Sequence, residues 1–319
     1  ADFDHRLPDY SKRVSLVAIT GGINVSGFIN PVYRLAEKAH AAGAQILVDC
    51  AQLAPHRKVD MLPAEDPRHL DYVTISAHKL YAPFGPGALV GRRDTFQQGA
   101  PDYRGGGQVD IVTLDSVAWS DAPERDEAGS PNTVGAVALS AALCQLQAVG
   151  MDQVAAHEAE LTAYALPRLL GVPGLHIYGD TDPAQAASRL GVIPVQMEGV
   201  SHFLLAAVLS YEFGIGLRNG CFCAHPYILD LLDVQENEAR YVRERILNGD
   251  RSEVPGLVRI SFGLYNQFDE IDYLVDALHC VARRGYRGVY RQDPASGDYV
   301  PQGWQVNCDD YFSVKHFQK

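Results

Sequence analysis

The hydrophobic pattern of the first hundred residues predicts strands that alternate with a helix. The apolar run "LVAIT" (16–20) predicts a buried parallel strand, and the loop "GGINVSG" follows it. Pro31 suits a first helical turn, and Gly43 is placed to end a helix with apolar residues at helical spacing: Val32, Leu35, Ala36 and Ala39. Further strands are expected at 45–49, 71–76 and 87–91. Strand, helix and strand form a right-handed crossover, so the sequence predicts an α/β layer with a mostly parallel sheet.

The pattern changes beyond residue 130. "SPNTVGAVALSAALCQLQAVG" (130–150) predicts a helix with Ser130 as N-cap, and a second helix follows at 151–170. Strands near 192–197 and 257–262 and a helix near 269–284 predict a smaller α+β domain. We therefore expect a large domain over 1–150, a small domain over 151–285 with a charged insertion near 230–253, and a polar tail without clear period over 286–319.

Composition and charge narrow the classes of function. The 319 residues are 47% hydrophobic and 21% charged, as in soluble globular proteins. A formal net charge of −12 disfavours nucleic acid as a partner. Apolar runs such as "LLAAVL" (204–209) are too short to cross a membrane. The six cysteines lack the dense spacing of a disulfide scaffold and no signal peptide opens the chain, so a cytoplasmic location is expected.

Polar residues follow three of the predicted strands. Ligands of open parallel sheets bind at the carboxyl ends of the strands, where this chain has Asn24, Asp49, Gln52, Ser76, His78 and Lys79. Lys79, beside a Gly/Pro-rich turn, is suited to form a Schiff base, and Asp49 could keep a pyridine nitrogen protonated, as pyridoxal phosphate (PLP) requires. Taken singly, each residue also has an ordinary explanation. Lys79 could be a solvated surface lysine, and Asp49 could be a turn or cap residue at the end of a strand.

The stretch "GCFCAHP" (220–226) brings two cysteines close together. Cys221 and Cys223 could form a metal clip, a redox pair or buried packing, or one could be a nucleophile beside a bystander. Only one residue separates the sulfurs and only His225 lies nearby, so we predict no metal site here. Strand alternation turns Cys50 away from its neighbour Asp49, so we expect it in the core.

Five segments resemble, in order, the landmarks of class V aminotransferase-fold (fold type I) PLP-dependent enzymes. They are "VDCAQLAPHRKVD", "DYVTISAHKLYAPFGPGALVG", "EAGSPNTVGAVAL", "RNGCFCAHP" and "VRISFGLYNQFDEID". The resemblance covers about residues 10–283 and is greatest to the cysteine desulfurase and selenocysteine lyase branch. It implies a PLP-dependent transferase fold, with a large domain on a mostly parallel sheet and a smaller C-terminal α+β domain.

The resemblance also implies how the cofactor is held. Lys79 would carry PLP as an aldimine, and Asp49 would pair with the pyridinium nitrogen. Gln52 would hydrogen-bond the phenolic oxygen, while Ser76 and His78 would contact the phosphate.

By the same resemblance, four residues would serve the substrate and the assembly. Asn24 matches an asparagine near the cofactor and the substrate carboxylate, and Arg259 would clamp that carboxylate. Ser130 stands where the family has a threonine that reaches the partner subunit's phosphate, which implies a homodimer. Cys223 matches the nucleophile that takes sulfur as a persulfide. The resemblance thus implies a lyase or sulfurtransferase that removes sulfur from an L-cysteine-type amino acid, with a protein sulfur acceptor as a possible partner.

The chain departs from the family pattern in two places. The family has a longer stretch before "VAIT", with a phosphate-binding loop and a residue that stacks on the pyridine ring, so we expect either a fragment or a second chain that completes the site. The charged segment 230–253 is longer than the link expected in simple desulfurases. The alternatives are another class V enzyme (an epimerase, an aminotransferase or a molybdenum-cofactor-sulfurase-like protein) and a truncated, non-catalytic homologue.

Overall fold

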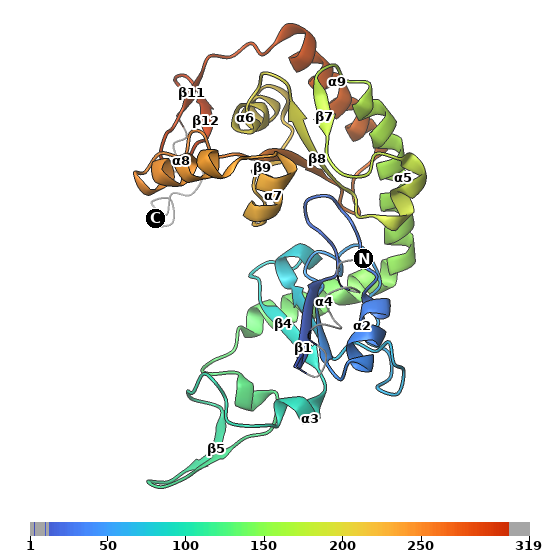
Figure 1. The fold of residues 1–319 in the computed structure, drawn as a ribbon, viewed down its shortest axis with the longest axis vertical. Coiled ribbons are helices and arrows are strands. Elements are labelled where there is room, and N and C mark those ends of the chain that lie inside the picture. The colour runs from blue at the N-terminus through green and yellow to red at the C-terminus, as the bar shows by residue number, and fades with distance from the viewer. Residues whose placement is uncertain (1–2, 4–9, 11–12, 306–319) are drawn as a thin grey trace, which may run out of the picture. The chain divides into compact units, whose positions relative to one another are not determined.

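A computed structural model describes residues 3, 10 and 13–305 of the chain. The chain forms two compact units: unit 1 comprises residues 1–160 and 187–190, and unit 2 comprises residues 161–186 and 191–319. The division falls inside helix α5 (Met151–Leu170). Each unit has a sheet of its own (Figure 1).

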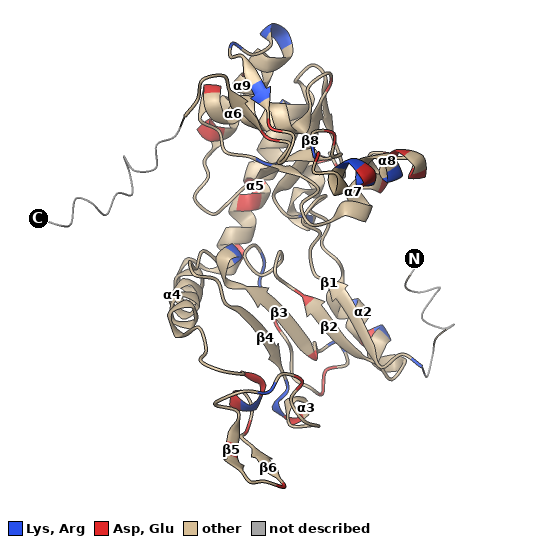
Figure 2. Ribbon diagram, turned by 90° about the vertical axis from the view of Figure 1, so that its left-hand side faces the viewer, with Lys and Arg blue, Asp and Glu red and all other residues tan. Residues whose placement is uncertain are grey.

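Unit 1 is built on a four-stranded sheet of order β1-β2-β3-β4 (Figure 2). The strands β1 (Leu16–Thr20), β2 (Gln45–Asp49) and β3 (Tyr72–Ser76) run parallel, which confirms the predicted α/β layer. The predicted burial of β1 was wrong, because none of its five residues is buried. The fourth strand, β4 (Gly87–Gly91), is antiparallel to β3. The connection between β3 and β4 is too short for the crossover that parallel pairing needs, since such crossovers take about a dozen residues or more.

Helix α2 (Val32–Ala41) lies on β1 and β2 and confirms the predicted helical spacing. All four of the apolar residues that predict it are buried: Val32, Leu35, Ala36 and Ala39. Burial of each large apolar side chain stabilises such packing by about 1.5–3 kcal/mol. The helix therefore holds β2 in place, and β2 ends at the predicted site residue Asp49.

The rest of unit 1 holds elements that the hydrophobic pattern predicts only in part. Helix α4 (Thr133–Val149) begins two residues later than a Ser130 N-cap predicts, and its N-cap is Asn132, whose side chain accepts a hydrogen bond from the Gly135 amide. The prediction of Ser130 as N-cap was therefore wrong. The remaining elements, none of them predicted, are η1 (Ala77–Leu80), α3 (Arg93–Phe96), the hairpin β5 (Val109–Val112) and β6 (Val117–Trp119), and η2 (Glu124–Asp126).

Unit 2 contains a four-stranded antiparallel sheet of order β7-β8-β10-β9. Its strands are β7 (Leu175–Ile177), β8 (Val192–Met197), β9 (Arg218–Gly220) and β10 (Leu257–Ser261). Its helices are α6 (His202–Phe213), α7 (His225–Leu231), α8 (Glu236–Leu247) and α9 (Phe268–Arg284); η3 (Pro183–Ser188) spans the division between the units. The strands and the helix predicted for the α+β region correspond to β8, β10 and α9.

The core of unit 2 lies between this sheet and its helices. Buried side chains from α5, α6, β8, β10 and α9 form one cluster, for example Leu166, Leu205, Ile193, Ile260 and Leu278. A reciprocal cap between Gln267 and Glu270 begins α9. The described part of the tail contains a hairpin, β11 (Tyr290–Gln292) and β12 (Tyr299–Pro301), where the sequence shows no clear period. Residues 306–319, including Cys308, lie outside the described residues.

In the part of the chain that the structure describes, no single helix has both the length and the apolar character to cross a membrane. Only α4 and α5 taken together meet that criterion, and the pair is bent by 75°.

Candidate active site

The carboxyl edge of the parallel strands in unit 1 carries the predicted cofactor residues. Register pairs Thr20 with Asp49, and Asp49 with Thr74. Oδ1 of Asp49 accepts from the Ala51 amide at 2.9 Å and lies 3.5 Å from the Thr74 hydroxyl. No hydrogen bond from a described residue reaches Oδ2 of this exposed carboxylate. Asp49 therefore offers one carboxylate oxygen to a ligand at the sheet edge.

Lys79 lies on the 3-10 turn η1, directly after β3. The flanking residues Ala77 and Leu80 are buried, whereas Lys79 is exposed. The Ala77 amide donates to the Pro86 carbonyl oxygen at 3.0 Å, which ties the turn to the start of β4. The turn thus anchors the backbone on both sides of Lys79 and presents the amine at the carboxyl end of β3.

The other predicted cofactor residues follow the same strands. Ser76 is the last residue of β3 and His78 is exposed on η1. Gln52 is half-buried in the turn after β2, and Asn24 is half-buried in the turn after β1. These four residues all belong to segments at the carboxyl edge, as the strand pattern predicts.

Ser130 lies two residues before the N-cap of α4 and is exposed. The Asn132 side-chain amide donates to the Phe84 carbonyl oxygen at 2.7 Å, so the start of α4 is joined to the loop after Lys79. A Cβ atom at Gly135 would lie 2.5 Å from Pro86 Cδ, so only glycine permits this close approach. The packing holds the segment of Ser130 next to the turn that carries Lys79.

Unit 1 also has an apolar groove of about 1080 Å³ between the sheet and α4. Its walls include Val73, Leu80, Leu139 and Leu146. None of the predicted site residues lines it. We therefore place the candidate chemistry at the polar strand ends of unit 1 rather than in this groove.

In unit 2, Cys223 lies on a tight turn between β9 and α7. Phe222 and Cys223 both have positive φ, at 52° and 63°, and Phe222 is buried while Cys223 is exposed. Nη2 of Arg218 lies 3.9 Å from the sulfur. The turn therefore presents a thiol to solvent beside a guanidinium group.

Arg259 lies on β10, directly across the ladder from Arg218 on β9. Its Nε donates to the Ser261 hydroxyl at 3.0 Å, and its guanidinium carbon lies 5.1 Å from the centre of the Phe222 ring. Burial lowers the pKa of Arg259 and the charge of Arg218 lowers it further, whereas Cys223 acts in the opposite sense. Two guanidinium groups and one thiol thus share a single corner of the unit 2 sheet.

The other two cysteines near the predicted site residues differ from Cys223. Cys221 is buried, its thiol donates to the Pro255 carbonyl oxygen at 3.0 Å, and burial raises its pKa. Cys50 is fully buried, which confirms its place in the core, and burial together with the charge of Asp49 raises its pKa to about 12. These features favour a packing role for both thiols.

Sequence reasoning missed Arg218, Thr74 and Asn132 as parts of these sites. Arg218 opens the quoted motif "RNGCFCAHP", so its presence could have been noted. Its position opposite Arg259 depends on strand register, which the sequence alone does not fix.

Comparison with known proteins identifies the family of this chain. The aminotransferase class-V family model matches residues 2–274. The chain is 36% identical over 273 residues to a cysteine desulfurase of Dickeya dadantii. The aligned residues make up 85% of this chain and 58% of that protein. It is 37% identical over 275 residues to a cysteine desulfurase of Klebsiella pneumoniae. The aligned residues make up 86% of this chain and 60% of that protein. The chain therefore spans about 60% of the length of these curated relatives.

Solved structures agree with the family match. The cysteine desulfurase CsdA from Escherichia coli has a TM-score of 0.70 and 29% identity, covering 87% of this chain and 61% of that one. A cysteine desulfurase from Thermococcus onnurineus has a TM-score of 0.70 and 28% identity, covering 87% and 63%. These structural neighbours confirm the predicted PLP-dependent transferase fold. Because the family model matches most of this chain, the chain belongs to the aminotransferase class-V family.

Proposed function

We propose that this chain carries the cofactor-binding and sulfur-accepting residues of a PLP-dependent, cysteine desulfurase-like enzyme. The observation that carries the proposal is the Cys223 thiol, which is exposed and lies 3.9 Å from the Arg218 guanidinium. The two curated relatives described above, which are named cysteine desulfurases, support the same assignment.

The residues at the unit 1 edge fit PLP. The exposed Lys79 amine would hold the cofactor covalently, and the available carboxylate oxygen of Asp49 would pair with a pyridinium nitrogen. Gln52, Ser76 and His78 would supply hydrogen bonds to its oxygen atoms, with Ser130 contributed by a partner subunit. Bound PLP supplies an electron sink for bonds at the substrate α-carbon.

Arg259 would bind the carboxylate of the amino-acid substrate, with Asn24 as a second contact. A guanidinium group has a planar pair of donors that matches a carboxylate. In this structure the Arg259 guanidinium donates to the Ser261 hydroxyl and lies near the Phe222 ring. That support orients the donors before a substrate arrives.

Cys223 would accept the sulfur atom. A nearby positive charge favours the thiolate form of a cysteine, and Arg218 supplies that charge. In the net reaction the carbon–sulfur bond of cysteine breaks, a sulfur–sulfur bond forms to Cys223, and the carbon takes a proton. Alanine and a Cys223 persulfide result, and an exposed persulfide can pass its sulfur to an acceptor protein.

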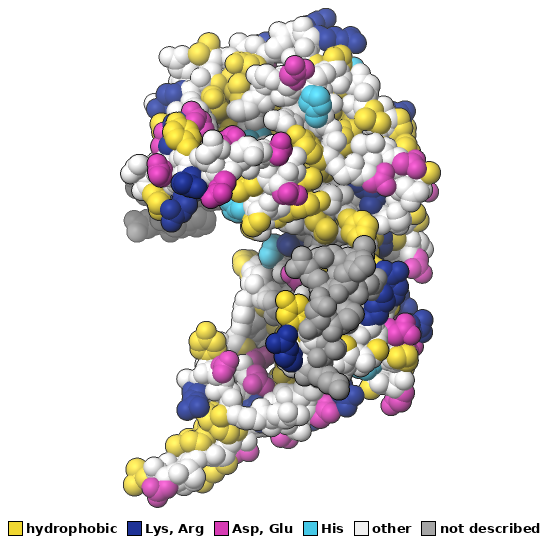
Figure 3. Space-filling view, viewed as in Figure 1, with side chains coloured by type: hydrophobic (Ala, Val, Ile, Leu, Met, Phe, Trp, Pro, Cys, Tyr) yellow, Lys and Arg dark blue, Asp and Glu magenta, His cyan; other side chains and the backbone are white. Residues whose placement is uncertain are grey.

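A homodimer would complete the proposed assembly. Unit 1 exposes large apolar side chains on the first turns of α4 and on the β5–β6 hairpin, among them Val134, Val137, Ile111, Val112 and Leu114. Figure 3 shows hydrophobic side chains along that hairpin. Ser130 directly precedes the exposed turns of α4, so an interface built on this surface would bring Ser130 to a second subunit.

The test compares Cys223→Ala with Cys221→Ala in the PLP-loaded protein. We expect Cys223→Ala to reduce sulfide release from cysteine at least about 100-fold, because the sulfur acceptor is lost. The visible spectrum of the cofactor should not change. Cys221→Ala, which removes a buried thiol from the same motif, should retain most of the activity.

The outcomes separate the proposed reactions. Unchanged sulfide release in Cys223→Ala would exclude the desulfurase reaction, and activity on other amino acids would then favour another class V reaction. Loss of the cofactor spectrum in Cys223→Ala would assign the residue to cofactor binding instead.

A further inference from the structure

A cluster of two histidines and one aspartate lies in unit 1, apart from the proposed active site. His40 is in the last turn of α2, and His69 and Asp71 precede β3. The two imidazole rings stack, with centroids 4.2 Å apart and 19° between their planes. Nitrogen and oxygen atoms of the three side chains lie within 4.8 Å of one another. Three ligand-type side chains thus lie close together.

Both histidines have a fixed orientation. Nδ1 of His40 lies 2.7 Å from the Pro67 carbonyl oxygen, and Nδ1 of His69 lies 2.7 Å from the Asp66 carbonyl oxygen. A carbonyl oxygen only accepts hydrogen bonds, so each Nδ1 carries the hydrogen. In a neutral imidazole this leaves the lone pair on Nε2. Such a backbone contact is the usual outer support of a histidine that binds a metal through Nε2.

Both Nε2 atoms face the same carboxylate. Nε2 of His40 lies 3.0 Å from Oδ2 of Asp71, and Nε2 of His69 lies 3.4 Å from Oδ1. Oδ2 also accepts from the Ile46 amide at 2.8 Å. Two ligands of a tetrahedral zinc ion, each at about 2.0–2.2 Å from the metal, are about 3.4 Å apart. Each Nε2 thus lies near that distance from one oxygen of Asp71, although the two contacts end on different oxygens. The stacked rings would have to turn toward each other for both Nε2 lone pairs to point at one ion.

The cluster is mostly shielded from water. The side chain of Asp71 is 7% exposed, and those of His40 and His69 are 18% and 15% exposed. A buried carboxylate needs partners to offset its desolvation, and a bound cation is such a partner. The two histidines are thus partly accessible to solvent, whereas the carboxylate is buried.

We propose that Nε2 of His40, Nε2 of His69 and the carboxylate of Asp71 bind one divalent transition-metal ion of the zinc type, with water as the remaining ligand. Two imidazoles and one carboxylate suit such ions better than magnesium or calcium, which prefer oxygen ligands.

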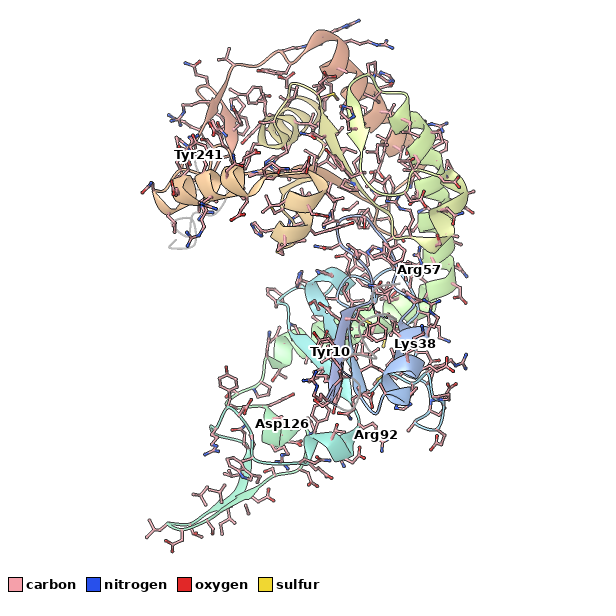
Figure 4. All side chains as sticks on the ribbon, viewed as in Figure 1. Tyr10, Lys38, Arg57, Arg92, Asp126 and Tyr241 are labelled. Atoms are coloured by element: carbon pink, nitrogen blue, oxygen red, sulfur yellow. The ribbon has the colours of Figure 1, made fainter. Side chains whose placement is uncertain are left out.

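The ion would have a structural role. Asp71 lies just before the amino end of β3, whereas Ser76 is its last residue and Lys79 follows its carboxyl end. The ligands connect the last turn of α2 to the segment before β3, and Asp71 also reaches Ile46 of β2. Figure 4 labels Lys38 on α2, two residues before His40. The ion would therefore join three elements of the sheet layer at the edge opposite the proposed cofactor residues.

The test is a Co²⁺ titration of the metal-free, full-length chain in a Cys223→Ser background, which removes the exposed thiol of the proposed active site. We expect a saturable visible absorption of a low-coordinate Co²⁺ site, displaced by one equivalent of Zn²⁺. His69→Gln should weaken Co²⁺ binding at least about tenfold, as for the loss of a ligand or its support. His176→Gln, a change at an exposed histidine on β7, should leave it unchanged.

A second readout guards against unfolded variants. Zn²⁺ should raise the thermal midpoint of the parent protein and not that of His69→Gln, because an ion that binds only the folded state stabilises it. Circular dichroism of the metal-free forms checks that the variant is folded. No saturable absorption in the parent, or equal Co²⁺ affinity in His69→Gln, overturns the proposal.

Discussion

The candidate residues of unit 1 are held by a sheet edge, whereas the candidate nucleophile of unit 2 lies on a strained turn. Asp49 ends a buried parallel strand, and Lys79 lies on a turn whose Ala77 and Leu80 are buried. Cys223 instead follows Phe222 in the left-handed region, and each such non-glycine residue costs about 1–3 kcal/mol. Burial of Phe222 offsets that cost. The groups proposed to hold the cofactor thus have a rigid base, and the group proposed to receive and pass on sulfur lies on a turn.

The largest expected effect tests the sheet edge. Lys79→Ala should abolish the covalent link to PLP, because no amine would remain on η1 to form it. The measurement is the absorption band at about 420 nm that is expected for a lysine-bound PLP. Borohydride should reduce this linkage to a stable adduct. Lys58→Ala is the matched control, since it removes an exposed lysine from the same unit. A reducible band that persists in Lys79→Ala would disprove the assignment.

The second prediction compares thiols in the two regions. At pH 8, a thiol with a pKa of about 12, as for Cys50, is on the order of a thousandfold less ionised than an ordinary cysteine. Cys221 should also react slowly, because burial raises its pKa. Iodoacetamide labelling, measured by mass spectrometry of peptides, should therefore modify exposed Cys223 and Cys144 well before Cys50.

Raising the pH should increase labelling of Cys50, since the thiolate fraction of a group with a raised pKa grows until the pH passes that pKa. In denaturant, Cys50, Cys221 and Cys223 should react at similar rates. Labelling of native Cys50 as fast as Cys144 would show that its burial does not control its reactivity.

The same contrast explains what the sequence could predict. The strands that end at Asp49 and Ser76 are apolar runs whose carboxyl ends must share an edge, so this half of the site follows from pattern and topology. The pairing of Arg218 with Arg259 depends on antiparallel register between two segments far apart in the chain. Ser130 and Asn132 are both good N-cap residues, but in the structure Asn132 caps the Gly135 amide and also contacts Phe84. Local propensity predicts the strands, whereas caps and register need tertiary contacts.

The third prediction tests the unit 2 corner. Arg259→Lys should raise the KM for cysteine about 10- to 100-fold, because a lysine cannot make the paired hydrogen bonds of a guanidinium to a carboxylate. Arg218→Lys is the matched change across the ladder and should lower kcat more than it raises KM, since Arg218 contacts the Cys223 sulfur. Steady-state kinetics of both variants distinguish the two roles. Equal effects on KM would assign both arginines to the substrate.

The smallest expected effect concerns the start of α4, which is joined to the turn of Lys79. Asn132→Ala removes the cap of the Gly135 amide and the bond to Phe84, and should destabilise unit 1 by about 1 kcal/mol. That corresponds to a fall of about 2–4 °C in the thermal midpoint. Ser130→Ala should cause no such fall, because Ser130 does not cap the helix. Asn132→Asp keeps an acceptor for the cap but lacks the donor to Phe84. Its thermal midpoint should therefore lie between those of Asn132→Ala and Ser130→Ala. If Asn132→Asp is as stable as the parent, the link to the Lys79 loop contributes little, and the rigidity of this edge comes from the sheet and the buried residues of η1.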